Sequence, residues 1–147
     1  MKNHPKINRI NQRGVVTVEF TLVATLLFFA IFAIIGIART VYIYNAANNA
    51  TRLGARLAVV CAPAAANNIR ARMVARVSGL TNGNINIDYN PAGCNVNTCN
   101  SVTVAINNFS VAIATPANIQ LGSFTLPNFS TTLVRESMNS TNNNVCN

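Results

Sequence analysis

Residues able to do acid–base or metal chemistry are few in this 147-residue chain. Its only acidic residues are Glu19, Asp88 and Glu136, and its only histidine is His4. Asp88 and Glu136 are far apart in the sequence, and the chain offers no glycine-rich phosphate loop or Ser–His–Asp set. We therefore expect no enzymatic activity, no cofactor, no bound metal and no small-molecule substrate.

The four cysteines are the other reactive side chains: Cys61, Cys94, Cys99 and Cys146. An even set favours disulfides if this part of the chain lies outside the cytoplasm. Cys94 and Cys99 flank the short loop CNVNTC, so the first expectation pairs them and leaves Cys61 for Cys146, with other pairings open. Zinc is the alternative, but zinc sites usually contain close Cys-x-x-Cys pairs, and the one close pair here has a different gap.

Glu19 lies near the start of an apolar segment, Val15 to Ala38, that contains no other charge. As a helix this segment would extend about 36 Å, enough to cross the ~30 Å hydrocarbon core of a bilayer with some tilt. It is too long for a cleavable secretory signal. Four basic residues precede it: Lys2, Lys6, Arg9 and Arg13. The positive-inside rule therefore predicts a cytoplasmic N-terminus and translocation of the rest of the chain.

A glutamate inside a membrane span needs a reason, because a buried charge is costly there. The cost falls near the interface, and an acid near a helix N-terminus gains about 0.3–1 kcal/mol from the helix dipole. Glu19 in a simple membrane anchor without a further role is therefore one interpretation.

The stretch RGVVTVEF (residues 13–20) resembles the processing site of type IV pilin-like proteins. In that family a prepilin peptidase cuts after the glycine, and glutamate is the fifth residue of the mature chain. Counted from Val15, Glu19 is the fifth residue here. Val15 and Val16 depart from the pattern, in which alanine is commoner.

A second stretch makes the resemblance more specific. YNAANNATRLGARLAVV (residues 44–60), with its triplet Gly54-Ala55-Arg56, is similar to the segment after the membrane helix in TadE-like pseudopilins of tight-adherence (Flp) pilus systems. The later stretch FSTTLVRESM (residues 129–138) is a weaker match. The four cysteines are not general in that family.

The resemblance implies a minor pilin or pseudopilin, a structural or assembly subunit that is cut between Gly14 and Val15. Glu19 would be an assembly residue. The implied partners are the prepilin peptidase, other pilin or pseudopilin subunits and the pilus assembly platform. The implied location is the bacterial inner membrane, single-pass, with the C-terminal domain periplasmic or pilus-associated. Two alternatives stay open: an unprocessed single-pass protein whose exported domain binds an envelope component, and a minor pseudopilin of a type II secretion or DNA-uptake system.

The chain divides on this interpretation into a basic leader (1–14), a transmembrane helix half (15–38) and an extracytoplasmic TadE-like domain (39–147). Helical periodicity continues from Arg39 to Cys61, and Pro63 ends it. Residues 64–78 predict a short second helix. Strand-like runs follow at residues 84–89, 101–106, 109–114 and 129–136. We predict a pilin-like α+β fold with a long N-terminal helix, a short helix and a small three- or four-stranded antiparallel sheet.

Two further patterns concern contacts. Small residues recur every four positions in the long helix, at Ala46, Ala50, Gly54 and Ala58. Such a stripe lets another backbone approach closely, either the chain's own sheet and second helix or a neighbouring subunit. The formal charge of +8 comes from scattered basic residues without interleaved aromatic side chains for base stacking, so we expect no nucleic-acid partner.

Overall fold

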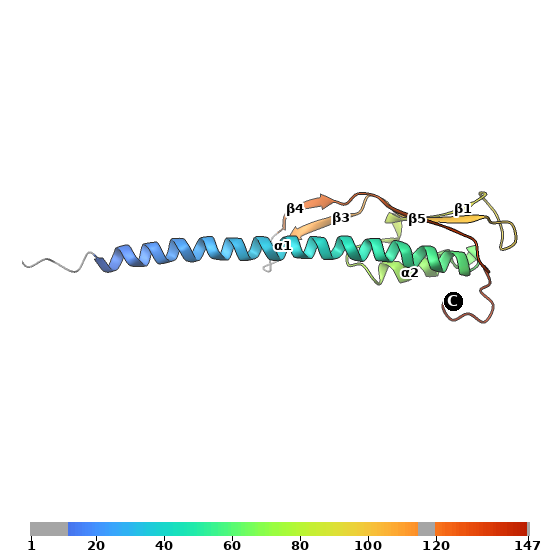
Figure 1. Ribbon diagram of the computed structural model, residues 1–147, viewed down its shortest axis with the longest axis horizontal. Helices are drawn as coiled ribbons and strands as arrows, with labels where there is room; N and C mark the ends of the chain where they lie inside the picture. The colour runs from blue at the N-terminus through green and yellow to red at the C-terminus, as the bar shows by residue number, and fades with distance from the viewer. Residues whose placement is uncertain (1–11, 115–119, 147) are drawn as a thin grey trace, which may run out of the picture. The chain divides into compact units, whose positions relative to one another are not determined.

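The computed structural model describes residues 12–114 and 120–146 (Figure 1). The chain forms two compact units, Met1–Ile37 and Ala38–Asn147. The helix α1 (Gln12–Val60) supplies all the described residues of the first unit and the first 23 residues of the second, from Ala38 to Val60.

In the first unit the helix is exposed on every side. Its large apolar side chains from Val15 to Ile37 all face outward, and Phe20 and Phe29 are each 72% exposed. The hydroxyl groups of Thr21 and Thr25 donate to the carbonyl oxygens of Val18 and Thr21, at 2.9 Å and 2.7 Å. These bonds satisfy the hydroxyl donors inside an apolar segment. The helix is long and apolar enough to cross a membrane.

In the second unit a short helix follows the end of α1. A 3-10 turn (Pro63–Ala65) comes first, and then α2 (Ala66–Val74). The helix predicted over 64–78 was therefore too long at both ends. Its first residues form the tighter turn that begins at Pro63, and after Val74 the amides of Arg76 and Val77 bond to carbonyls three residues back.

The strands form two separate sheets. β1 (Ile85–Asn90), β2 (Ser101–Ile106) and β5 (Phe129–Val134) make an antiparallel sheet in the order β1-β2-β5. Within the described residues β3 (Ser110–Ala114) pairs with β4 (Gln120–Thr125) alone, so these two strands form a ribbon apart from the sheet. The α+β layout is confirmed. The strand expected over 109–114 is in the ribbon, and β4 was not predicted.

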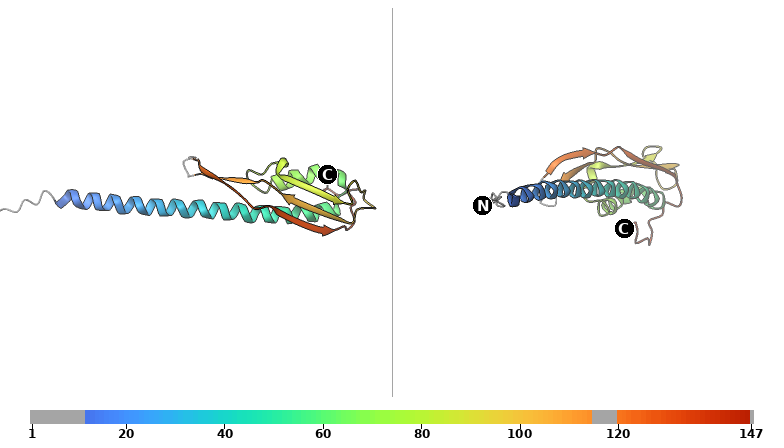
Figure 2. Two further views of the ribbon diagram at one scale, coloured as in Figure 1. Left: turned by 90° about the horizontal axis from the view of Figure 1, so that it is seen from above. Right: turned by 60° about the vertical axis from the view of Figure 1, so that its left-hand side comes forward.

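The core lies where α1, α2 and the three-stranded sheet meet (Figure 2). On β2 the side chains of Val102, Val104 and Ile106 are buried, and the alternate residues face outward, as expected for a strand with one covered face. A Cβ atom added at Gly54 would overlap Met73 Sδ and lie 3.2 Å from Val104 Cγ1. The absence of a side chain at Gly54 thus lets α1, α2 and β2 approach one another closely.

Candidate processing and assembly site

Gly14 lies in the first turn of α1 and is exposed. Beyond its own helix turns, no atom of the described residues lies within 4 Å of the position that a Cβ would occupy, so this side of its backbone is open to approach. A glycine in a helix costs about 1 kcal/mol relative to alanine. Gly14 therefore weakens the helix locally at the point where the sequence predicts the cut.

Glu19 lies on the same helix, four residues after Val15. Residues four apart are neighbours on one face of a helix, and their backbones are about 6 Å apart along the helix axis. The side chains of Val15 and Glu19 are both exposed. Among the residues whose side chains the structure describes, no hydrogen bond or ion pair is formed by the Glu19 carboxylate, which leaves it available to a partner.

A shallow groove follows the helix beside Glu19. It is lined by apolar and threonine side chains: Val18, Thr21, Leu22, Thr25 and Leu26. Because Thr21 and Thr25 return their hydroxyl groups to the backbone, these two positions of the groove present small, internally satisfied side chains. Small residues at this spacing are typical of places where membrane helices pack together.

The small-residue stripe of the second unit lies mostly inside the chain's own fold. Ala50 and Ala58 are at most 2% exposed, Gly54 is buried against Met73 and Val104, and Ala46 is partly buried. Of the two contacts considered for this stripe, the structure contains the one with the chain's own sheet and second helix.

The four cysteines form two disulfides, Cys61–Cys146 and Cys94–Cys99, in the pairing that the sequence favours. None remains as a free thiol to serve as a zinc ligand. The Cys61–Cys146 bond fixes the C-terminal tail to the end of α1. The tail is also held by its amides, since Glu136 N and Met138 N both donate to Val59 O, at 3.2 Å and 3.3 Å.

One pair of polar groups was not singled out from the sequence. The hydroxyl oxygen of Tyr89 on β1 and Nε of Arg70 on α2 are both buried without a hydrogen-bond partner among the described residues. Burial raises the pKa of the Tyr89 phenol above its usual value, and the charge of Arg70 opposes that rise. The alternating pattern of residues 84–89 predicted a strand, but it did not show that this hydroxyl would be buried within the influence of the Arg70 charge.

The chain was compared with known protein families. The model of the family described as "TadE-like protein" matches residues 14–56. The matched region begins at Gly14, includes Glu19 and ends with the triplet Gly54-Ala55-Arg56. The resemblance to TadE-like proteins is thereby confirmed over this part of the chain. No curated protein and no solved structure matches the chain significantly.

Proposed function

We propose, from the TadE-like match over residues 14–56, that this chain is a structural or assembly subunit of a tight-adherence (Flp) pilus system. It would be a minor pilin or pseudopilin that a prepilin peptidase cuts after Gly14. The observation that carries the proposal is the position of Gly14 and Glu19, five residues apart, at the start of an apolar helix with outward-facing side chains.

The cut itself is supported by the local structure around Gly14. A protease needs its substrate in an extended form, and a helix opens most readily at its first turn and at a glycine. Gly14 has both properties, and among the described residues beyond its own helix turns no atom lies within 4 Å of the position of an added Cβ. The cut would also remove the basic residues that precede the segment, so the mature chain would begin with an apolar helix.

The role of Glu19 follows from the new N-terminus. The cut creates a positively charged amine on Val15, about 6 Å along the helix axis from Glu19. In an assembly of parallel helices the carboxylate can pair with its own amine or with that of a neighbour. Pairing lowers the cost of a charge in an apolar environment and sets the axial register between subunits. The groove at Thr21 and Thr25 would let the neighbouring helix come close.

The proposed location is the bacterial inner membrane, with the N-terminus cytoplasmic and the second unit periplasmic. Two disulfides in the second unit suit an oxidising compartment. The proposed partners are the prepilin peptidase, other pilin or pseudopilin subunits and the assembly platform. The subunit would act by packing and would catalyse no reaction.

Intact-mass measurement of the chain extracted from its native membranes tests the proposal. The expected mass is that of a chain that starts at Val15. A chain that starts at Met1, in cells with an active prepilin peptidase, would reject the proposal in favour of an unprocessed single-pass protein.

A further inference from the structure

The ribbon β3–β4 stands apart from the sheet and lies at one end of the second unit. A ring contact between Tyr44 and Phe129, with centroids 5.1 Å apart, places the start of β5 beside Tyr44. The other end of β5 reaches the end of α1, where Glu136 N bonds to Val59 O. The three-stranded sheet therefore covers α1 from Tyr44 to Val59, and the ribbon branches off at the Tyr44 end.

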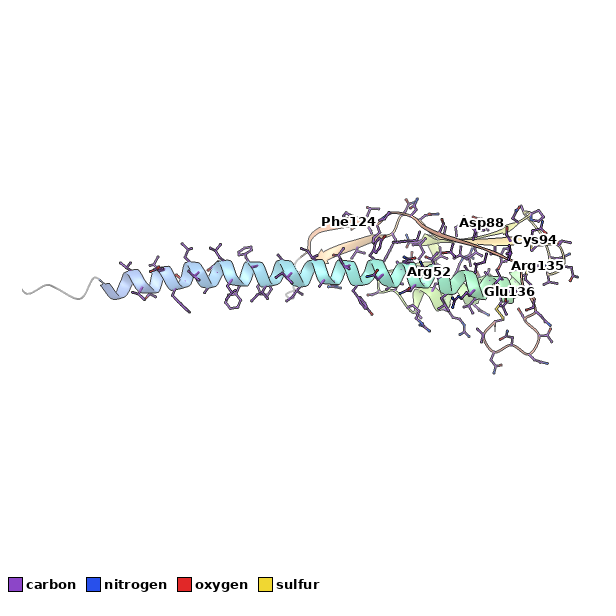
Figure 3. All side chains as sticks on the ribbon, viewed as in Figure 1. Arg52, Asp88, Cys94, Phe124, Arg135 and Glu136 are labelled. Atoms are coloured by element: carbon purple, nitrogen blue, oxygen red, sulfur yellow. A yellow bond between two sulfur atoms is a disulfide. The ribbon has the colours of Figure 1, made fainter. Side chains whose placement is uncertain are left out.

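The figures show where the ribbon goes within this unit. In Figures 1 and 2, β3 and β4 lie alongside α1 beyond the end of the three-stranded sheet, on the side away from the C-terminal end of α1. In Figure 3, Phe124 on β4 lies at this end, whereas Cys94, Arg135 and Glu136 lie at the opposite end of the unit. Ala38 is the residue at which the apolar segment ends.

The surface at this end is suited to an interface between water and lipid. Phe124 is 52% exposed, although its cross-strand neighbour Val111 is buried. On α1, three and four residues after Ala38, Val41 is 52% and Tyr42 is 73% exposed. Tyrosine is enriched where membrane proteins meet the lipid headgroups, because its ring is apolar and its hydroxyl is polar.

The charge pattern agrees with this assignment. No residue from Tyr89 to Val134 is charged, so both strands of the ribbon and their connection are neutral. Exposed strand edges in water usually carry charged residues that prevent unwanted pairing, and an isolated two-stranded ribbon is only marginally stable in water. A neutral ribbon with an exposed phenylalanine is therefore better suited to a partly apolar environment than to water alone.

The distance to the bilayer is short. The helix rises about 9 Å from Ala38, where the apolar segment ends, to Tyr44. This length is close to the thickness of one interfacial layer of a bilayer, which is roughly 5–8 Å. We propose that the end of the second unit formed by Phe124, Tyr42 and Val41 contacts the bilayer interface, so that the β3–β4 ribbon is a second membrane contact beside the helix. The inference rests on the membrane span in the proposed function.

Tryptophan fluorescence tests this contact, because the chain contains no tryptophan. We would prepare the full chain with Phe124→Trp in phosphatidylcholine–phosphatidylglycerol vesicles whose acyl chains are brominated at a shallow or a deep position. Val134→Trp is the matched control, since Val134 is 75% exposed on the edge strand β5 and lies next to Arg135 at the opposite end. Phe29→Trp, 72% exposed in the apolar segment, reports the span itself.

We expect blue-shifted emission from the Phe124→Trp chain and stronger quenching by shallow than by deep bromines. The Val134→Trp chain should be quenched by aqueous iodide only. If the Phe29→Trp chain is quenched by lipid and the Phe124→Trp chain is not, this inference is wrong and the span stands. If neither of these two chains is quenched by lipid, the proposal that the apolar segment crosses the membrane is wrong too. A third outcome would also contradict the inference. If the tryptophan at position 124 is protected from iodide but not quenched by lipid, and only at high protein density, a second copy of the chain covers this surface.

Discussion

Cys146, one residue from the C-terminus, is bonded to Cys61, the residue that directly follows α1. The two cysteines are 85 residues apart in sequence, whereas Cys94 and Cys99 are 5 residues apart. Near the first bond the amide group of Asn68 on α2 donates to Cys146 O at 3.1 Å. Cys146 is thus tied both to the residue after α1 and to α2.

The two disulfides should differ in what they contribute to stability. In the chain-entropy account a bond that closes a longer loop constrains the unfolded chain more, which gives about 4–5 kcal/mol for Cys61–Cys146 and about 2 kcal/mol for Cys94–Cys99. We expect Cys61→Ser with Cys146→Ser to lower the free energy of unfolding more than Cys94→Ser with Cys99→Ser. Urea unfolding of the full chain in detergent, followed by circular dichroism, measures both. Equal losses would contradict this expectation.

Gly14 and Gly36 form a matched pair for testing the cut. Both lie in α1, and at neither does an atom of the described residues beyond the adjoining helix turns lie within 4 Å of the position of an added Cβ. Alanine should therefore fit at both sites, and the small gain in helix propensity should be similar. We expect Gly14→Ala to leave most of the chain uncut and Gly36→Ala to mature normally, as read from intact mass. If both variants mature alike, the glycine is not what the peptidase requires.

Glu19 and Glu136 allow a similar comparison for assembly. Both carboxylates are exposed, but only Glu19 lies near the proposed new amine. Glu19→Gln keeps the size of the side chain and removes the charge, so we expect normal cutting and a severalfold loss of the subunit from sheared pilus fractions or from cross-links to pilin. Glu136→Gln should assemble as the unchanged chain does. Equal recovery of the two variants would mean that the charge of Glu19 has no role in assembly.

Tyr89 provides a test of the core of the second unit. Its buried hydroxyl has no partner among the described residues, and such a group costs about 1–3 kcal/mol. We expect Tyr89→Phe to raise the free energy of unfolding by about 1 kcal/mol. Tyr42→Phe should change nothing, because Tyr42 is 73% exposed. A loss of stability in Tyr89→Phe would show that the hydroxyl is bonded in solution.

The pKa of Tyr89 adds a pH dependence with a definite sign. Burial raises the pKa of this phenol in the folded chain, so above pH about 10 the unfolded chain loses this proton first. The unfolded state then holds fewer protons, and stability falls as the pH rises toward the raised pKa. Below that range Tyr89 contributes no pH dependence. The Tyr89→Phe chain should show a smaller fall between pH 10 and 11 than the unchanged chain, measured by the same unfolding curves.

The strands illustrate how far sequence patterns reach. The alternation in residues 101–106 located β2 correctly, because one of its faces is buried and the other is not. β4 was missed because QLGSFT contains a glycine and only a weak alternation. The expected strand over 129–136 ends at Val134, where Arg135 N bonds instead to Asn100 O in the loop before β2. Such a partner is distant in sequence, so local pattern could not identify it.

The sequence by itself determined the properties that depend on neighbouring residues. These are the apolar helix, the spacing of Gly14 and Glu19, the break at Pro63 and the closeness of Cys94 to Cys99. Only the tertiary structure decided that Gly54 meets Met73 and Val104, that β3 leaves the sheet to pair with β4, and that Phe124 remains uncovered. Those contacts join residues far apart in the chain, and they depend on how the packed elements exclude water and fill space, which no local periodicity encodes.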